Sequence, residues 1–563
     1  MYANKTHSVP VPHIKGIKIY KNGYVYYASS QKWDNEKKRP VDNRRIIGKI
    51  DSSREGYMFP NHTFSELLPE YLALSEPSQS SDTQSFGAFA VLEKSAAEIG
   101  LLQPLQHNFP ELWKEMLALA AYMICTQSSV SQGFEGWFFH NYAGLADSLS
   151  SQDISRIYKE IGLNEEARKD CLAQFRELYM KQIPHHNDQT VIAFDSTNQN
   201  TASDNIVEAA YGKAKKDEGL PCVATAMFVD EMDGVPVWYE TFCGSLTDKT
   251  ETPFTLEKAA DLGFRNLFLV MDRGYCSKSV VQAIQKLSAE QEKENSGKMG
   301  FVISCPENLT FVKETLALYS KDLIEKESNY IYPEKAYGMR IPCEEIFGTQ
   351  CWQYFFYDPA TAEYIRENIH ETVMNKMQLA LKKKRYSEGL VKSNENWLII
   401  EPAEKSPVTG RNFTVRVNEA AIQEKIDKAG YFVAISNEEM DAEEMLAYIR
   451  TRDRSEKAFS TLKTQLDMEK SHCHSSETYN GKMFVAFLAL VIRQAYQWFI
   501  RDTLATRTSM SVHSSLMEMN KYDMYRKEDG NWAPKYAMTN IQKKLGQNIK
   551  IDEAYLIKRV RSL

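Results

Sequence analysis

Two short apolar runs, each followed directly by an aspartate, constrain the fold of this chain most. Residues 191–194 (VIAF) precede Asp195, and residues 267–271 (LFLVM) precede Asp272. Apolar runs of this length are typical of buried strands in an α/β sheet. An aspartate after a strand is also common as a turn or cap residue. We expect both carboxylates at strand C-termini, where open sheets bind ligands and where hard oxygen donors suit magnesium or manganese.

A third acid lies in the run 448–463, YIRTRDRSEKAFSTLK. Arg452, Glu456 and Lys463 are spaced by four and seven residues, which places them on one face of a continuous helix. Such a stripe is also typical of a solvated, salt-bridged helix surface. Together with the two aspartates, however, Glu456 forms a set of three acids that is more specific than any of its parts.

With these acids the chain resembles the DDE transposases of bacterial insertion sequences (the IS-four superfamily), RNase H-like enzymes whose last motif carries tyrosine, arginine, glutamate and lysine. The resemblance extends from about residue 15 to about residue 500. The matching segments are FDST (194–197), AYGK (210–213), DGVP (233–236), FCGSLTDKT (242–250), MDRG (271–274) and the set Arg452, Glu456, Phe459 and Lys463.

The resemblance implies an enzyme that cleaves transposon ends and joins them to target DNA. Asp195, Asp272 and Glu456 would be its catalytic residues and would hold two Mg²⁺ (or Mn²⁺) ions, which activate a water or 3′-hydroxyl and stabilise the leaving oxygen. Its partners would be double-stranded DNA, as terminal repeats and target, and a second copy of the chain in a homodimer. The residues expected to contact DNA are Arg452, Lys463, Tyr448, Arg273 and Lys213.

One departure from the family pattern concerns the tyrosine. The signature places it three residues before Arg452, where this chain has Ile449, and the chain has Tyr448 instead. One residue rotates a helical side chain by roughly 100°. We expect Tyr448 either to reach the DNA backbone from a different angle or to serve in packing.

Other functions that the residues allow are a DNA-binding regulator descended from a transposase and a metal-dependent nuclease without joining activity. A glycosidase is disfavoured, because a glutamate between Arg452 and Lys463 would be held ionised and would be a poor general acid. Residues 472–474 (HCH) are interpreted as a loop, since adjacent ligands cannot easily close one tetrahedral site. Residues 185–186 (HH) are assigned no role.

Composition fits a large cytoplasmic enzyme, which would be nucleoid-associated when bound to DNA. The net charge of −7 argues against sequence-independent DNA contact, but residues 1–60 hold 12 Lys and Arg against 5 Asp and Glu, and residues 521–563 hold 10 against 5. Nine cysteines without a C-x-x-C pair indicate reduced thiols. We expect no signal peptide and no membrane span, because the longest apolar run, 483–492, is too short and fits a core helix.

The predicted fold class is α/β: an RNase H-like mixed-sheet catalytic domain with an insertion domain, preceded by a small β-rich arm and a helical domain. An insertion is expected because 183 residues separate Asp272 from Glu456. The expected ranges are the arm at 1–75 with possible DNA-end binding, a linker at 76–84, a helical DNA-binding domain at 86–185, the catalytic domain at 188–305 and 429–505, the insertion at 306–428 and a C-terminal helical tail at 506–563.

Local patterns add finer expectations. Lys21-Asn22-Gly23 is a hairpin signal in the arm. Residues 149–162 predict a serine-capped amphipathic helix, which resembles part of a helix-turn-helix element but is also common in any helical domain. In the catalytic domain we expect strands at 190–194, 222–229, 235–242, 267–271, 301–304 and 431–435, with helices near 253–262 and 278–287.

Overall fold

The computed structural model describes residues 8–35, 38–71, 80–182, 189–212, 219–506, 510–527 and 529–563. The chain divides into two compact units, Met1–Ser81 and Asp82–Leu563, which we call unit 1 and unit 2. Most of the predicted linker at 76–84 lies outside the described residues.

Unit 1 is built around an antiparallel sheet with the strand order β1-β5-β4-β3-β2. Helix α1 (His62–Leu67) packs on the sheet, and Val25, Ile47, Met58 and Phe64 form part of the core. The predicted hairpin at residues 21–23 is confirmed and joins β2 to β3, with Gly23 in the left-handed region that its turn requires. The strands are β1 (Val9–Pro10), β2 (Ile17–Ile19), β3 (Tyr24–Asp34), β4 (Arg39–Ile50) and β5 (Tyr57–Pro60).

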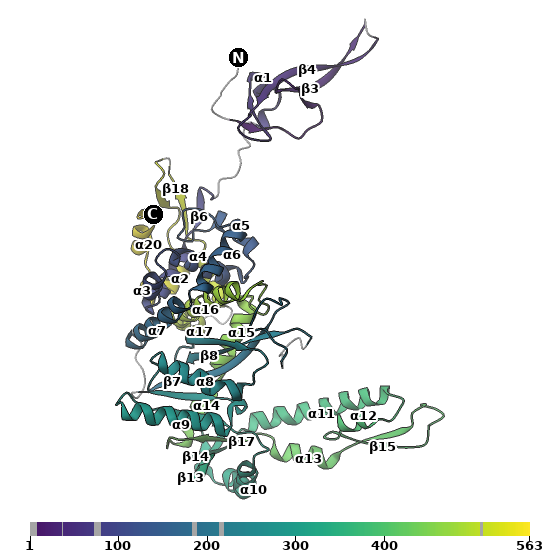
Figure 1. Ribbon diagram of the computed structural model, residues 1–563, viewed down its shortest axis with the longest axis vertical. Helices are drawn as coiled ribbons and strands as arrows, with labels where there is room; N and C mark the ends of the chain where they lie inside the picture. The colour runs from purple at the N-terminus through teal and green to yellow at the C-terminus, as the bar shows by residue number, and fades with distance from the viewer. Residues whose placement is uncertain are drawn as a thin grey trace. The chain divides into compact units, whose positions relative to one another are not determined.

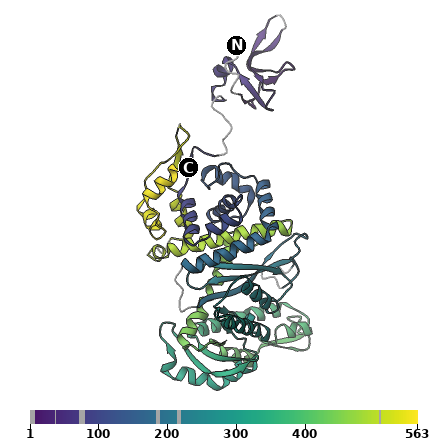
Figure 2. The same ribbon diagram turned by 60° about the vertical axis from the view of Figure 1, so that its left-hand side comes forward.

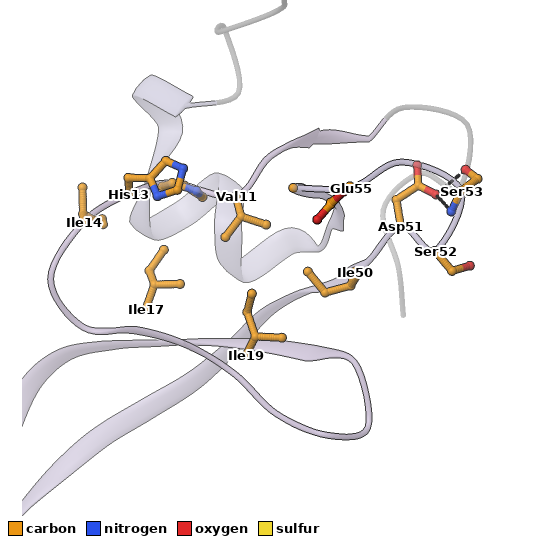
Figure 3. Close-up of a pocket in the computed structure, with 12 residues that line it drawn as sticks. Val11, His13, Ile14, Ile17, Ile19, Ile50, Asp51, Ser52, Ser53 and Glu55 are labelled. Atoms are coloured by element: carbon orange, nitrogen blue, oxygen red, sulfur yellow. Dashed lines mark hydrogen bonds between the residues drawn. The ribbon is translucent and has the colours of Figure 1, made fainter.

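A cavity of about 1080 Å³ opens on unit 1. Figure 3 shows apolar side chains, among them Val11, Ile17 and Ile50, on one side of it and the carboxylate of Asp51 on the other. That carboxylate accepts hydrogen bonds from the backbone N–H and the hydroxyl of Ser53, at 3.0 and 2.5 Å. These bonds fix the loop between β4 and β5.

Unit 2 is a mixed α/β structure around a nine-stranded sheet with the order β12-β13-β14-β17-β11-β10-β7-β8-β9. Strands β7, β10 and β11 are mutually parallel, and the other pairings are antiparallel. The strands are β7 (Thr190–Asn200), β8 (Cys222–Asp230), β9 (Pro236–Cys243), β10 (Leu267–Met271), β11 (Gly300–Ser304), β12 (Tyr330–Ile331), β13 (Ala336–Ile346), β14 (Thr349–Tyr357) and β17 (Tyr431–Ser436). Every strand predicted for the catalytic domain is thereby confirmed.

Both faces of this sheet are covered, which explains why β10 is apolar throughout. Leu269 of β10 joins the core on one side, with Val280 of α9 (Lys278–Lys293), while Phe268 joins the core on the other side, with Met445 of α14 (Ala442–Thr451). Alternate residues of a strand point to opposite faces. Helices α8 (Asp248–Asp261) and α9 confirm the two helices predicted between the strands.

A helical layer precedes the sheet in sequence, and α16 lies between this layer and the sheet (Figure 2). Helix α6 carries the predicted serine cap, with Ser150 and Asp153 forming a reciprocal capping box. Residues 483–492 lie in α16 and are buried, as predicted for a core helix. The helices are α2 (Gly87–Glu98), α3 (Leu102–Asn108), α4 (Trp113–Thr126), α5 (Phe134–His140), α6 (Ser151–Leu163), α7 (Glu165–Gln182) and α16 (Ser476–Phe499).

Helices α6 and α16 approach so closely that their contact requires glycine. A Cβ atom added at Gly162 would lie 1.7 Å from the carbonyl oxygen of Glu477, and one added at Gly481 would lie 1.8 Å from that of Tyr158. The backbones of α6 and α16 are therefore in direct contact at these two glycines.

The segment 306–428, predicted as an insertion, consists of two structurally different parts. Strands β12, β13 and β14 extend the main sheet beside β17, and α10 (Thr310–Glu325) packs on this part of the sheet. The remainder projects from the sheet (Figure 1) and has a small core of its own that includes Ala380, Leu398 and Phe413. This remainder comprises α11 (Pro359–Lys382), α12 (Glu388–Lys392), β15 (Leu398–Pro402), β16 (Phe413–Val417) and α13 (Glu419–Lys428).

The C-terminal segment, predicted as a helical tail at 506–563, also contains two strands. Strand β18 (Asp523–Arg526) pairs with β19 (Trp532–Pro534) and with β6 (Thr83–Ser85) from the start of unit 2. The helices around them are α17 (Arg501–Thr506), α18 (Val512–Met519), α19 (Asn540–Gln547) and α20 (Glu553–Arg561).

Two further expectations concern composition. All nine cysteines lie in the described part of the chain and are free, seven of them buried. Among the described helices none is both long and apolar enough to cross a bilayer.

Candidate active site

The two aspartates lie on neighbouring parallel strands. Phe194 of β7 is in register with Met271 of β10, so Asp195 and Asp272 follow at adjacent positions. Neighbouring strands are about 4.8 Å apart, and residues in register point to the same face. Asp272 directly follows the last residue of β10, as predicted.

The prediction that Asp195 ends its strand is wrong. Strand β7 continues to Asn200, and Asp195 is paired with Met227 in the middle of the β7–β8 ladder. Residues 196–200 are polar and give no apolar signal, but their backbone groups are satisfied by β8. The strand therefore extends beyond the run that the sequence marks.

The carboxylate of Asp195 has two defined hydrogen-bond donors. Its Oδ1 accepts from the backbone N–H of Ser196 at 2.8 Å and from the hydroxyl of Tyr275 at 3.3 Å. Burial first, and then the negative charge of Asp195, raise the pKa of Tyr275 well above its usual range. Tyr275 therefore remains a neutral donor that helps to position Asp195.

Asp248 is a further acid at the site that was not predicted from the sequence. The hydroxyl of Ser196 donates to its Oδ1 at 2.5 Å, and Asp248 is the first residue of α8. Its charge also acts on Tyr275. The only signal in the sequence was its place in the matching segment 242–250.

The helix that carries Glu456 is not continuous, so the prediction of one helix face is wrong in part. Helix α14 ends at Thr451, α15 spans Asp453–Ser460, and a π-helical turn, η5, follows at Thr461–Gln465. Arg452 lies at the junction of α14 and α15 and remains one turn from Glu456. A π-helical turn uses i→i+5 hydrogen bonds, so it changes the direction of a side chain relative to an α-helix.

Lys463 lies within η5, near the thiol of Cys222. Cys222 pairs with Asn200 at the far end of β7 from the aspartates. Burial raises the pKa of Cys222, and the positive charge of Lys463 opposes that shift. Lys463 thus acts electrostatically on Cys222, and its contact with DNA stays a prediction.

Arg452 connects two of the three acids. Its Nη1 donates to Oδ1 of Asp272 at 2.6 Å, and its Nη2 donates to Oε1 of Glu456 at 2.8 Å. The guanidinium group presents several donors in a fixed fork, which suits two carboxylates at once. Asp272 Oδ1 also accepts from the backbone N–H of Arg273 at 2.6 Å. Glu456 is thereby held close to Asp272 at the end of β10.

These residues line a cleft of about 660 Å³. Asp272, Arg273, Arg452 and Glu456 line it together with side chains of the projecting segment, including Lys425 and Lys428 of α13 and Trp397. The amine of Lys425 lies 5.0 Å from the centroid of the Trp397 ring. Acidic groups and cations thus line the same cleft.

Tyr448 lies in α14 and packs against the sheet. Its ring centroid is 5.3 Å from that of Phe268, and its hydroxyl donates to Oε1 of Glu444 at 3.4 Å. Burial is the largest cause of its raised pKa. The structure thus has Tyr448 in packing, and its contact with DNA stays a prediction.

The remaining predicted residues differ in what the structure describes. Arg273 is exposed and lines the cleft. Lys213 and residues 185–186 lie outside the described residues. Residues 472–474 form a loop between η5 and α16, as predicted.

Residues 186–492 match the family described as Transposase DDE domain. Because the match covers more than half of the chain, this protein belongs to that family. No curated protein matches the chain in sequence. A cryo-electron microscopy structure of a piggyBac transposase synaptic complex with hairpin DNA is similar with a TM-score of 0.30 and 9% identity, over 71% of this chain and 60% of that chain. The chain thus spans less than two thirds of that protein's length.

The donor set of the site fits a hard divalent cation, which members of this family generally use. Mg²⁺ prefers carboxylate oxygens, and Asp195 and Asp272 lie beside each other on adjacent strands. Across the described ranges, no three His, Cys, Asp or Glu side chains are grouped closely enough to hold a metal ion. The two aspartates therefore suit the cation by type and position, whereas Glu456 shares its carboxylate with Arg452.

Proposed function

We propose that this protein is a transposase of the IS-four type that cleaves the ends of its element and joins them to target DNA. The observation that carries the proposal is the site itself: two aspartates on adjacent parallel strands, with Glu456 joined to the second of them through Arg452. Its family membership supports the same conclusion.

An RNase H-like arrangement of the catalytic domain belongs to this proposal. Strands β9, β8 and β7 are consecutive antiparallel neighbours, and β10 and β11 continue beside β7 in parallel. This mixed order, with Asp195 on β7 and Asp272 directly after the neighbouring β10, supports that fold.

The residues of the site have distinct tasks in the proposed reaction. Asp195, Asp272 and Glu456 would hold Mg²⁺ or Mn²⁺, two ions per site, and such ions would supply activation of the attacking oxygen and charge stabilisation of the leaving one. Tyr275 and Ser196 keep Asp195 oriented through the hydrogen bonds described above. Arg452 and Arg273 offer positive charge to a phosphate in the cleft.

The DNA path belongs to the proposal as well. Lys425 and Lys428 line the same cleft as Asp272 and Glu456, so a phosphate backbone in the cleft would meet cations as well as the acids. We also propose that two copies of the chain act together, because two ends must be cut in concert.

The test uses Asp195→Asn, Asp272→Asn and Glu456→Gln with duplex DNA that carries the element's terminal sequence. We expect each variant to bind this DNA like the wild type and to lose Mg²⁺-dependent cleavage by more than about a thousandfold. Asp453→Asn is the matched control: Asp453 lies in the same helix, and its partner is the exposed Lys457. Its cleavage rate should stay within about twofold of the wild type.

Cleavage that persists in any of the three variants would contradict the assignment of that acid. Wild-type cleavage without joining would identify a nuclease. Wild-type binding without cleavage would identify a DNA-binding regulator. Cleavage without joining would contradict the proposed strand transfer, and binding without cleavage would contradict the proposed enzymatic activity.

A further inference from the structure

Strands β3 and β4 of unit 1 extend far beyond the strands beside them. They pair from Tyr24–Lys49 to Asp34–Arg39, whereas β2 covers β3 only as far as Tyr27. Strand β5 covers β4 only at residues 48–50. Residues 28–34 and 39–45 therefore form a two-stranded ribbon, which we call the β3–β4 ribbon and which projects from unit 1 in Figure 1.

The β3–β4 ribbon contributes nothing to the core of unit 1. None of its described side chains is buried, and Trp33 near its tip is 64% exposed. A two-stranded hairpin alone is marginally stable in water, and an exposed tryptophan leaves a large apolar surface in solvent. Both features are typical of a surface that is completed by a partner.

The charge around the β3–β4 ribbon is positive in an otherwise acidic chain. Residues 1–60 carry a net +7, from 12 Lys and Arg against 5 Asp and Glu, while the whole chain carries −7. Arg39, Arg44 and Arg45 lie exposed along β4. A basic surface of this kind attracts a polyanion.

Two of these arginines form ion pairs within unit 1 in which a phosphate could replace the carboxylate. Arg44 lies 2.8 Å from Asp42, and Arg45 lies 2.9 Å from Glu66. Both pairs are exposed, and such pairs contribute little to stability. A phosphate can therefore replace either carboxylate at small cost.

We propose that the β3–β4 ribbon binds double-stranded DNA by entering a groove tip first. Arg44 on one face of the ribbon, and Arg39 and Arg45 on the opposite face, then contact the phosphates on the two sides of the groove. The major groove of B-DNA is wide enough for a two-stranded ribbon. Trp33 then packs its exposed ring against the sugars or base edges at the deepest point. This inference rests on the proposed function, because it assigns to the ribbon a part of the DNA that the transposase holds.

The experiment measures binding of the full chain to a 40-base-pair duplex with the element's terminal sequence, over a series of salt concentrations. We expect Arg44→Gln/Arg45→Gln to weaken binding at least tenfold. We also expect it to reduce the slope of log K against log salt by about 2, which corresponds to two lost phosphate contacts. Trp33→Ala should weaken binding with little change in the slope.

Lys15→Gln/Lys21→Gln is the matched control, since it removes the same charge from exposed positions of unit 1 outside the β3–β4 ribbon. Its loss of DNA affinity and its change in the salt slope should each be less than half of those measured for Arg44→Gln/Arg45→Gln. Thermal unfolding at the wild-type temperature would show that both double variants remain folded.

Equal losses in the two double variants, or no loss in the arginine pair, would overturn the proposal. So would a change in the molecular mass of the DNA-free protein in Arg44→Gln/Arg45→Gln, because the β3–β4 ribbon would then pair with a second copy. The cleavage assay with Asp272→Asn judges the proposed function separately. Cleavage that needs Asp272 but ignores the arginine pair overturns the inference alone.

Discussion

At the scale of single residues, Arg452 decides the geometry of the site. It is the group through which Asp272 and Glu456 are held together. The sequence predicted a cation beside Glu456, because the spacing of four residues on a helix requires it. It could not predict the contact with Asp272, which joins residues 180 positions apart and depends on how α15 meets the sheet.

Arg452→Lys should reduce cleavage at least about tenfold while DNA affinity falls by less than about threefold. A lysine keeps the charge but is a single point charge, so it cannot hold both carboxylates in one plane. Cleavage rates at saturating DNA and dissociation constants separate the two effects.

Arg450→Lys is a matched control for that change. Arg450 also bridges two carboxylates, those of Glu334 and Asp358, and these lie outside the set of three acids. Its cleavage rate should stay within about twofold of the wild type. Equal losses in both variants would show that Arg452 supports folding rather than the site.

At the scale of elements, strands and helices were more predictable than their ends. Each apolar run of the catalytic domain proved to be a strand, because burial on both faces leaves a continuous apolar signal. The extension of β7 through residues 196–200 and the π-helical turn η5 were not predictable. Both depend on pairing and packing with distant segments, and a periodicity of 3.6 residues assumes that the helix continues regularly.

The β8–β9 hairpin contains a buried acid that predicts a dependence of stability on pH. Burial first, and then the charge of Asp233, raise the pKa of Asp230 to about 7. In the unfolded chain an aspartate ionises near pH 3.9. Between these two pH values the unfolded state binds fewer protons than the folded state. The free energy of unfolding therefore falls as pH rises from about 4 to 7 and is constant above pH 7.

Asp230→Asn should reduce this fall, because an asparagine keeps an acceptor for the N–H of Met232 without the buried charge. Part of the fall remains, since burial also raises the pKa of the neighbouring Asp233. The variant should match the wild type near pH 4 and exceed it at pH 8 by up to about 4 kcal/mol, at about 1.36 kcal/mol per pKa unit. Urea titrations at pH 4, 6 and 8 measure the difference. The exposed Asp261→Asn serves as control, and a difference that does not change with pH would refute the prediction.

At the scale of the whole molecule, the chain consists of two units with separate cores. The sequence indicated an early β-rich arm from its hairpin signal and charge. It could not show that part of the segment 306–428 joins the main sheet. Strand pairing between residues 84 positions apart, such as Trp352 with Ser436, leaves no local mark in the sequence.

A chain that begins at Asp82 should fold like unit 2 of the full protein. The core of unit 1 includes Val25, Met58 and Phe64, and all members of that core belong to unit 1. Thermal unfolding of the shortened chain should lie within about 2 °C of the corresponding transition in the full chain, and its DNA affinity should fall. Aggregation or a large drop in the unfolding temperature would show that the two units depend on each other.

Strand β17 has a consequence for the evolution of this chain. It is paired with β11 on one side and with β14 on the other. Removal of residues 306–428 would leave the second side of β17 with open backbone donors and acceptors, which recruit strands from other molecules. Evolution could therefore shorten the projecting part of this segment without exposing the sheet. Loss of β14, however, would leave an open edge on β17 that promotes aggregation.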